Sequence, residues 1–230
     1  MLAVLYDIHG NLPALEAVLE DAERQDADRF FLGGDFAGMG AWPVESLARL
    51  QQLEPATWIR GNWERWQAHP EDAPDDAWLQ RAIAYAEGAL GPDLVAELAA
   101  LEQACVHENA LFCHASPQSD MRSFFPEPAE DEDELIDGVA EPMLVFGHTH
   151  LQFSRTSEHD ILMLNPGSVG LPLDGDRRAA YALVEENGGI ELRRVGYDSD
   201  AAAMDTRARM GELGEPTALR LEAARFDVQG

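Results

Sequence analysis

Residues 2–11 read Leu-Ala-Val-Leu-Tyr-Asp-Ile-His-Gly-Asn, an apolar run that ends in two metal-capable side chains, Asp7 and His9. A short apolar run bounded by glycine is typical of a buried β-strand. Four later runs end in the same way. They are residues 29–32 before Gly33, Gly34 and Asp35; 56–59 before Gly61 and Asn62; 110–113 before His114; and 143–146 before Gly147, His148, Thr149 and His150. We therefore predict five buried strands that each carry polar side chains at the carboxyl end.

Helical patterns separate the first of these strands. Asn11 can cap a helix that has Pro13 in its first turn and apolar residues along one face. Residues 44–53 repeat such a pattern. Because strands and helices alternate with short loops, the sequence predicts an α/β core.

The segment between the third and fourth predicted strands interrupts this alternation. It contains two helical patterns, residues 77–89 and 92–103, and we interpret residues 66–105 as a helical cap inserted into a single domain that spans residues 1–230. The later part of the chain has turn signals between apolar runs. We expect strands at residues 152–156, 161–164, 180–185 and 191–197, and helix over residues 200–230.

The composition disfavours several classes of function. Lys and Arg together number 16 against 43 Asp and Glu, and a formal net charge of −27 repels nucleic acids and anionic membranes. The chain contains Arg but no Lys, so the phosphate-binding lysine of a P-loop has no candidate. No apolar run is long enough to span a membrane, and the N-terminus lacks the pattern of a signal peptide. We therefore expect a cytoplasmic protein.

The polar residues at the strand ends form a candidate metal site, because open α/β sheets gather ligands at the carboxyl ends of their strands. Two carboxylates, one amide and four imidazoles are available: Asp7, His9, Asp35, Asn62, His114, His148 and His150. This thiolate-free set suits Mn, Fe, Co, Ni or Zn better than Ca, and it is too rich in His for Mg. The number of ligands indicates two ions, about 3.5–4 Å apart, that share one carboxylate.

These motifs resemble the calcineurin-like metallophosphoesterase family. The resemblance rests on Asp7-Ile8-His9-Gly10-Asn11, Gly34-Asp35, Gly61-Asn62, His114 and Gly147-His148-Thr149-His150, in this order over residues 7–150. Residues 164–170, Leu-Asn-Pro-Gly-Ser-Val-Gly, are similar to a motif of the compact bacterial and archaeal phosphodiesterase branch. The resemblance implies a four-layer α/β/β/α sandwich, in which the strands after residue 150 match the second sheet and the metals lie between the sheets.

The resemblance also implies a role for each ligand. Asp7, His9, Asp35 and His150 would hold the first metal ion, and Asp35, Asn62, His114 and His148 would hold the second. Asp35 would be the bridging carboxylate that positions a hydroxide for attack on a phosphodiester or phosphomonoester. The expected substrate is a small phosphorylated compound, for which a nucleotide is one candidate.

One position departs from the family pattern. Most members have Gly-Asn-His where residues 61–63 read Gly-Asn-Trp, and that His is taken to protonate the leaving group. The indole of Trp63 only donates hydrogen bonds and cannot act as a general acid near neutral pH. This substitution leaves a second interpretation open: a catalytically weak metal-binding scaffold or protein-interaction module of the same fold.

Five residues are candidates for contact with the substrate: Asn11, Arg60, Trp63, Asn165 and Ser168. Asn11 can reach a phosphate or cap the following helix. Arg60 can bind a phosphate through two nitrogens, although strand alternation directs it away from its neighbours. The turn at residues 165–168 can present backbone N–H groups to a phosphate or form a plain Pro-Gly turn. Trp63, with two other tryptophans of the predicted cap, can stack a nucleobase or fill the core.

Overall fold

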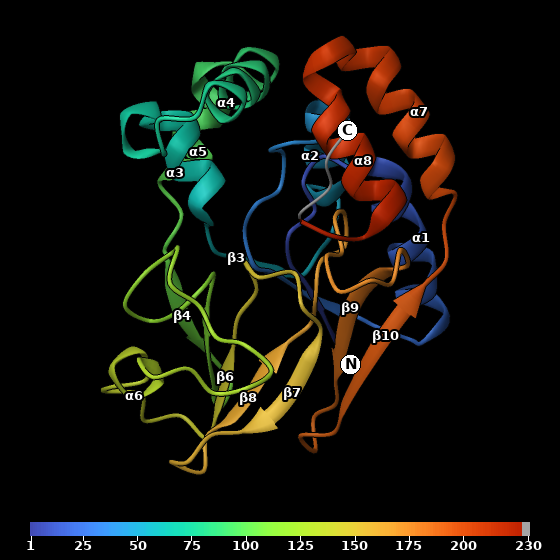
Figure 1. Cartoon of the computed structure of the whole chain (residues 1–230). Helices are drawn as coiled ribbons and strands as arrows, with labels where there is room; N and C mark the ends of the chain where they lie inside the picture. Colours follow the sequence, from blue (N-terminus) through green and yellow to red (C-terminus); the bar gives the residue numbers. More distant parts are fainter. Residues whose placement is uncertain (227–230) are drawn as a thin grey trace.

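Two five-stranded sheets form the centre of the structure, a computed structural model that describes residues 1–226 (Figure 1). The first sheet has the order β10-β9-β1-β2-β3 and the second has the order β4-β5-β6-β8-β7. The strands are β1 (Leu2–Leu5), β2 (Arg29–Leu32), β3 (Ala56–Trp58), β4 (Ala104–His107), β5 (Ala110–Cys113), β6 (Met143–Val145), β7 (Phe153–Thr156), β8 (Leu162–Asn165), β9 (Ala179–Val184) and β10 (Ile190–Val195). Strands β1, β2 and β3 run parallel, as do β5, β6 and β8, so their carboxyl ends meet at one edge.

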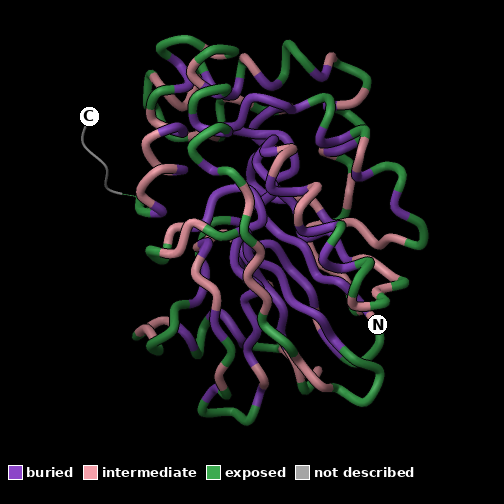
Figure 2. Tube along the Cα trace, turned by 90° about the vertical axis from the view of Figure 1, so that its right-hand side faces the viewer, coloured by how far each residue is buried: buried purple, intermediate pink, exposed green. Residues whose placement is uncertain are grey.

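The alternation of side chains along β1 explains how the layers are built. Leu2 and Val4 pack in the cluster between the sheets, together with Phe112 of β5. Ala3 and Leu5 point to the opposite face, where they pack against α1 (Leu12–Arg24) and α2 (Pro43–Leu50). Because both faces are covered, β1 is wholly buried. Figure 2 shows that the buried stretches of the chain gather in the interior of the trace.

The outer face of the second sheet is covered by the segment that contains α6 (Glu132–Leu135). Leu144 and Phe146 pack there against Phe124 and Leu135. The predicted α/β class and the α/β/β/α sandwich are thus confirmed, with a fourth layer that consists of a short helix and the loops beside it.

Two groups of helices stand at the edge where the parallel strands end (Figure 1). The first contains α3 (Asn62–Ala68), η1 (Pro70–Asp72), α4 (Ala77–Leu90) and α5 (Pro92–Ala99); the second contains α7 (Ser199–Met210), η2 (Gly211–Gly214) and α8 (Glu215–Ala223). The Trp78 indole N–H donates to the Leu213 carbonyl oxygen at 2.9 Å, and Ile83 packs in one cluster with Leu213 and Leu221. The two groups of helices therefore touch above the sheets.

Helix α3 begins at Asn62 and β4 begins at Ala104, so an element at each end of the predicted cap, residues 66–105, extends past its bounds. Two expectations about the elements are wrong. Strands β9 and β10 join the first sheet instead of the second, because β9 is buried along its whole length beside β1. The helix predicted for residues 200–230 is divided into α7, η2 and α8, and its last four positions lie outside the described residues. Within residues 1–226, none of the helices is long and apolar enough to cross a membrane.

Candidate metal centre

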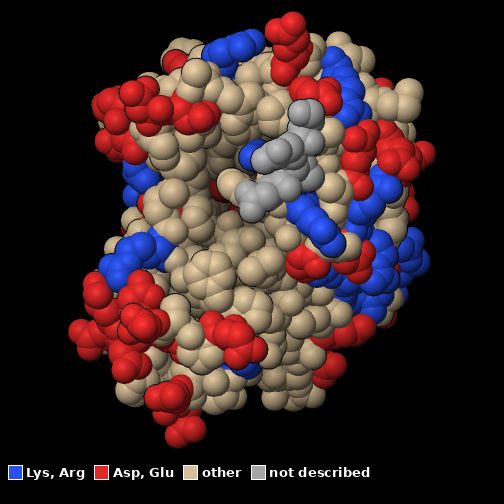
Figure 3. Space-filling view, in the orientation of Figure 1, with Lys and Arg blue, Asp and Glu red and all other residues tan. Residues whose placement is uncertain are grey.

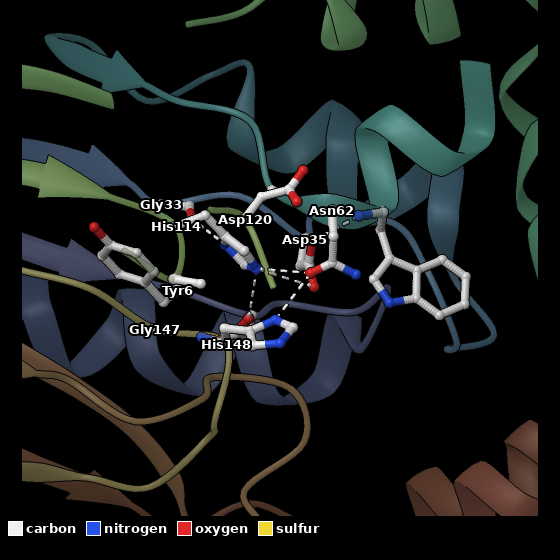
Figure 4. Close-up of polar contacts among 12 residues, drawn as sticks. Tyr6, Gly33, Asp35, Asn62, His114, Asp120, Gly147 and His148 are labelled. Carbon is white, nitrogen blue, oxygen red and sulfur yellow. Dashed lines mark hydrogen bonds and ion pairs between the residues drawn. The ribbon is translucent and has the colours of Figure 1, made fainter. Parts of the chain in front are cut away.

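The predicted ligands converge where the carboxyl ends of the parallel strands meet. Two groups of three have their ligand atoms within 4.8 Å of one another: Asp7, His9 and His150 form one, and Asp35, His114 and His148 form the other. Asn62, at the start of α3, joins the second group, since its Oδ1 lies 3.0 Å from His114 Nε2 and 2.9 Å from His148 Nδ1 (Figure 4). The structure therefore brings all seven predicted ligands together.

Asp35, a member of the second group, also approaches the first group. Its Oδ2 is 3.7 Å from His9 Nε2 and 3.4 Å from His114 Nε2. One carboxylate oxygen can therefore serve both groups, which is the arrangement that a shared ligand requires.

Several side-chain atoms of the site are placed as the ligands of a cation would be. Asp7 Oδ1 is buried and has no hydrogen-bond partner, a condition that is costly for a carboxylate oxygen unless something positive binds it. His9 Nε2 and His150 Nε2 face each other at 3.1 Å, so two imidazole nitrogens point at the same small volume. Carboxylate and imidazole atoms that converge in this way suit a divalent transition metal.

Backbone carbonyls fix which nitrogen of two histidines faces the centre. The Nδ1–H of His114 donates to the Gly33 carbonyl oxygen at 2.8 Å, and the Nδ1–H of His150 donates to the Leu171 carbonyl oxygen at 2.5 Å. With Nδ1 protonated, the Nε2 lone pair of each ring points inward. Such support of the second ring nitrogen is usual for histidines that bind metals.

Burial and mutual charge shift the protonation of these side chains. Burial raises the pKa of Asp7 to about 8, and burial lowers the pKa of His9 to about 4. Burial alone would lower the pKa of His114, but the Asp35 carboxylate beside it raises that pKa to about 10. Burial likewise opposes ionisation of Asp35, yet the neighbouring His114 holds its pKa below the usual range. Asp35 thus favours protonation of His114, and His114 Nε2 must lose that proton before it can bind a metal.

Most of the ligand residues have a left-handed backbone. The φ angles are 54° at Asp7, 48° at His9, 58° at Asp35, 68° at His148 and 59° at His150. Non-glycine residues seldom adopt this conformation, although Asp and His tolerate it better than most. Such strained positions concentrate at functional sites, where the surrounding structure holds them in place.

Glu64 supports the loops that carry Asp35 and Asn62, a role that was not predicted from the sequence. Its carboxylate is buried and accepts hydrogen bonds from the backbone N–H groups of Asp35 (2.9 Å), Phe36 (2.8 Å) and Gly61 (2.8 Å). Burial and the Asp35 charge raise the pKa of Glu64, while the three donors favour its ionised form. The sequence signal was its place three residues after Gly61, at the start of a helix, where a glutamate reaches back to the preceding backbone.

Gly61 also has a specific steric role. A Cβ atom at this position would lie 2.2 Å from Asp35 Oδ1 and 2.8 Å from His114 Cε1. No side chain fits there, so the glycine lets the third strand approach the centre of the site.

Tyr6 packs against His114 on the buried side of the site. Its ring is buried and stacks on His114 with centroids 6.5 Å apart, and its hydroxyl donates to the carbonyl oxygens of Cys113 (3.1 Å) and Val145 (3.3 Å) (Figure 4). These contacts fix the end of β1 relative to the ends of β5 and β6. From the sequence, Tyr6 was predicted only as the last residue of an apolar strand.

Two of the residues predicted to contact the substrate, Asn11 and Arg60, bind other protein groups in the structure. Asn11 caps α1, because its Oδ1 accepts from the Ala14 N–H, and its amide group donates to the Gly170 carbonyl oxygen at 2.7 Å and the Tyr197 hydroxyl at 3.1 Å. The Arg60 guanidinium lies 3.4 Å from Asp120 Oδ2, and Asp120 stands beside His114 and Asn62 (Figure 4). Both side chains thus have protein partners, and their contact with a phosphate stays a prediction.

The turn at residues 165–168 supports the ligand loops. Asn165 Nδ2 donates to the Gly147 carbonyl oxygen at 3.2 Å and to Thr149 Oγ1 at 3.0 Å. The Ser168 hydroxyl donates to the Asp7 carbonyl oxygen at 2.7 Å. Both side chains are fully buried, so they hold the loops of His148 and Asp7 instead of facing a substrate.

A cavity of about 890 Å³ opens from the metal centre and continues between the two groups of helices (Figure 3). Trp63 lies at its inner end, with its ring edge-on to His9 at a centroid distance of 6.1 Å and edge-on to Trp66 at 5.9 Å. The Trp63 backbone N–H donates to Asp35 Oδ1 at 3.0 Å. The residue that replaces the expected histidine is thus placed between the metal centre and the cavity.

Residues 1–189 match the family model described as the calcineurin-like phosphoesterase superfamily domain. The chain belongs to this family. An uncharacterised protein of Methanocaldococcus jannaschii is 29% identical over 220 residues, which cover 86% of this chain and 88% of that protein. This family membership confirms the resemblance drawn from the motifs.

Solved structures share the whole fold. A metallophosphoesterase from Sphaerobacter thermophilus is 26% identical, with a TM-score of 0.80 over 97% of this chain and 99% of that chain. A hypothetical protein from Pyrococcus horikoshii is 20% identical, with a TM-score of 0.81 over 94% of this chain and 97% of that chain. The matches extend past residue 189, so the C-terminal helices are part of the shared architecture.

Proposed function

We propose that the protein is a metal-dependent phosphoesterase that hydrolyses phosphodiester or phosphomonoester bonds at a dinuclear centre. The observation that carries this proposal is the pair of ligand groups, in which the Asp35 carboxylate of one group also approaches His9 of the other. Two divalent ions drawn from Mn, Fe, Co, Ni and Zn would supply Lewis acidity and lower the pKa of a bound water. The substrate would be a small phosphorylated compound.

The chain itself supplies positioning. Asp35 would serve as the shared ligand, and Glu64 fixes its backbone through the N–H of Asp35. Asp7, His9 and His150 would hold one ion, and Asn62, His114 and His148 would complete the other site. We also propose that the helices within residues 66–105 act as a cap, because they form one wall of the cavity beside the centre.

The chain offers no acid at residue 63. Trp63 stands beside His9, where an imidazole could have protonated the leaving group, and its indole cannot do so. General acid catalysis contributes about 10²–10⁴-fold, so esters with acidic leaving groups should be hydrolysed best.

The test is to load the protein with Mn, Ni, Fe or Zn in turn and compare an aryl phosphodiester with an aryl phosphomonoester. Wild type should hydrolyse the diester at least as fast as the monoester, and Trp63→His should raise the relative monoester rate. An unchanged ratio would show that residue 63 does not occupy the acid position. Asp35→Asn should lose most of the activity, whereas Asp93→Asn, exposed on α5, should retain it.

Trp63 also favours a second candidate function, a metal-binding scaffold with little catalysis. Its indole packs on Gly38, where a Cβ atom would lie 2.2 Å from the ring, so the tryptophan is an integral part of the core. Metal-loaded protein that hydrolyses neither aryl ester would support the scaffold and contradict the enzyme.

A further inference from the structure

The lining of the cavity becomes mainly apolar away from the metal centre. Its outer part is lined mainly by large apolar side chains, with Trp66, Trp78 and Leu79 on the side of α3 and α4 and with Leu171, Leu173 and Pro216 on the opposite side. In the space-filling view, most of the surface around the hollow belongs to residues without charge, while most Asp and Glu gather outside it (Figure 3). Such walls favour the binding of a ligand that has apolar surface itself, because the free energy falls when two apolar surfaces leave water and contact each other.

The lining also carries little charge to recognise a polyanion. Beyond the metal centre, the described residues that line it include one cation, Arg220, and one anion, Asp76. The Arg220 guanidinium lies 5.2 Å from the centre of the Trp78 ring, where it covers aromatic surface. Asp76 accepts the N–H of Leu79 as the cap of α4. A chain with a net charge of −27 would therefore repel several phosphates at once in this cavity.

Apolar side chains continue from the cavity onto its rim. Met121 is 39% exposed and Phe125 is 47% exposed, although both are large hydrophobic residues that line the cavity. Phe226, 65% exposed, lines it as well. Exposed apolar surface that is continuous with a pocket marks a place where a ligand is bound.

We propose that the substrate is a singly charged phosphodiester in which one ester group is a long alkyl or aryl chain that lies along this cavity. This inference rests on the proposed function, since the phosphate must sit at the metal centre beside Trp63. Hydrolysis then forms a bond between a water oxygen and phosphorus, breaks the bond from phosphorus to the leaving oxygen, and releases one proton of the attacking water to the solvent. An aryloxide can leave without a proton, which matches the missing acid at residue 63.

The test uses Mn-loaded protein and a series of alkyl 4-nitrophenyl phosphodiesters with methyl, butyl and octyl groups, with release of nitrophenolate as the readout. The value of kcat/KM should rise about two- to fourfold for each methylene that is buried, so the octyl ester should exceed the methyl ester by roughly 100-fold or more. A dinucleoside tetraphosphate should be a poorer substrate than the octyl ester. Equal values across the alkyl series, or a preference for the tetraphosphate, would overturn the inference while the phosphoesterase stands.

A matched pair of variants locates the effect. Phe125→Ser should lower the octyl-to-methyl ratio of kcat/KM several-fold, because the rim residue is exposed and its loss should leave the fold intact. Val106→Ser removes a similarly exposed apolar side chain on β4 that does not line the cavity, and its ratio should equal that of wild type. An equal fall in both variants, or no fall in Phe125→Ser, would refute the placement of the chain. Absence of nitrophenolate release from every ester would instead contradict the proposed function.

Discussion

Replacement of Glu64 with Gln removes an acceptor from a position where three buried backbone N–H groups converge. In the native protein, Oε2 accepts from Asp35 and Gly61, and Oε1 accepts from Phe36. A glutamine can turn its single oxygen toward two of these donors, but it must then direct its NH2 group at the third. One buried N–H is left without an acceptor, and no water can reach it because the side chain at residue 64 is fully buried.

The magnitude follows from this count. An unsatisfied buried donor costs about 1–3 kcal/mol, and the two remaining bonds also lose the strength that a charged acceptor gives them. For a domain of this size, Tm shifts by about 2–4 °C per kcal/mol, so a decrease of ~2–12 °C is expected. Because Glu64 also fixes the backbone of Asp35, the affinity for metal should fall by about 10–100-fold.

The assay is thermal unfolding of the metal-free protein, followed by titration with Mn and measurement of the dissociation constant. Glu97→Gln, on the exposed side of α5, is the matched control and should change neither quantity. The reasoning would be refuted if Glu64→Gln kept both the Tm and the metal affinity of the control.

Three further changes test other parts of the site. Gly61→Ala would place a Cβ atom 2.2 Å from Asp35 Oδ1 and should lower both metal content and the free energy of unfolding, the latter by about 1–3 kcal/mol. Gly88→Ala, in open space on α4, should raise it by about 0.5–1 kcal/mol; equal effects in urea unfolding would contradict the steric argument. Burial raises the pKa of Asp7 to about 8, and a carboxyl group must lose its proton to bind metal, so metal affinity should increase between about pH 6 and about pH 9. Calorimetric titration at several pH values checks this, and a decrease would count against Asp7 as a ligand. Tyr6→Phe removes the hydroxyl bonds between the sheets and should cost about 0.5–1.5 kcal/mol in urea unfolding, and an unchanged midpoint would show that these bonds are unimportant.

The sequence predicted the metal-facing part of the site well because strand ends and ligands are adjacent along the chain. Asp7 follows β1 and His114 follows β5, so short apolar runs were enough to place both side chains at one edge. The assignment of β9 to the first sheet could not be predicted in this way, because it depends on pairing with β1, which lies far away in the sequence.

Polar residues near the motifs were harder to interpret. Asn165 and Ser168 stand in a glycine-containing turn, and the sequence could not show whether they faced a ligand or the backbone of other loops. The structure shows that both are buried and bonded to backbone carbonyls, as buried polar groups generally must be. The role of Glu64 was missed for the same reason, since its three partners become neighbours only after folding.

The left-handed backbone at five of the candidate ligands limits which substitutions the site can accept over evolution or in design. Val, Ile and Thr, branched at Cβ, are excluded there by their own backbone before any question of metal chemistry arises. Asp, Asn and His remain, and these are also residue types whose side chains bind transition metals. Conformation and coordination thus restrict these positions to nearly the same few amino acids. An engineer who wants a different metal or reaction has more freedom at the cavity walls than at the ligands themselves.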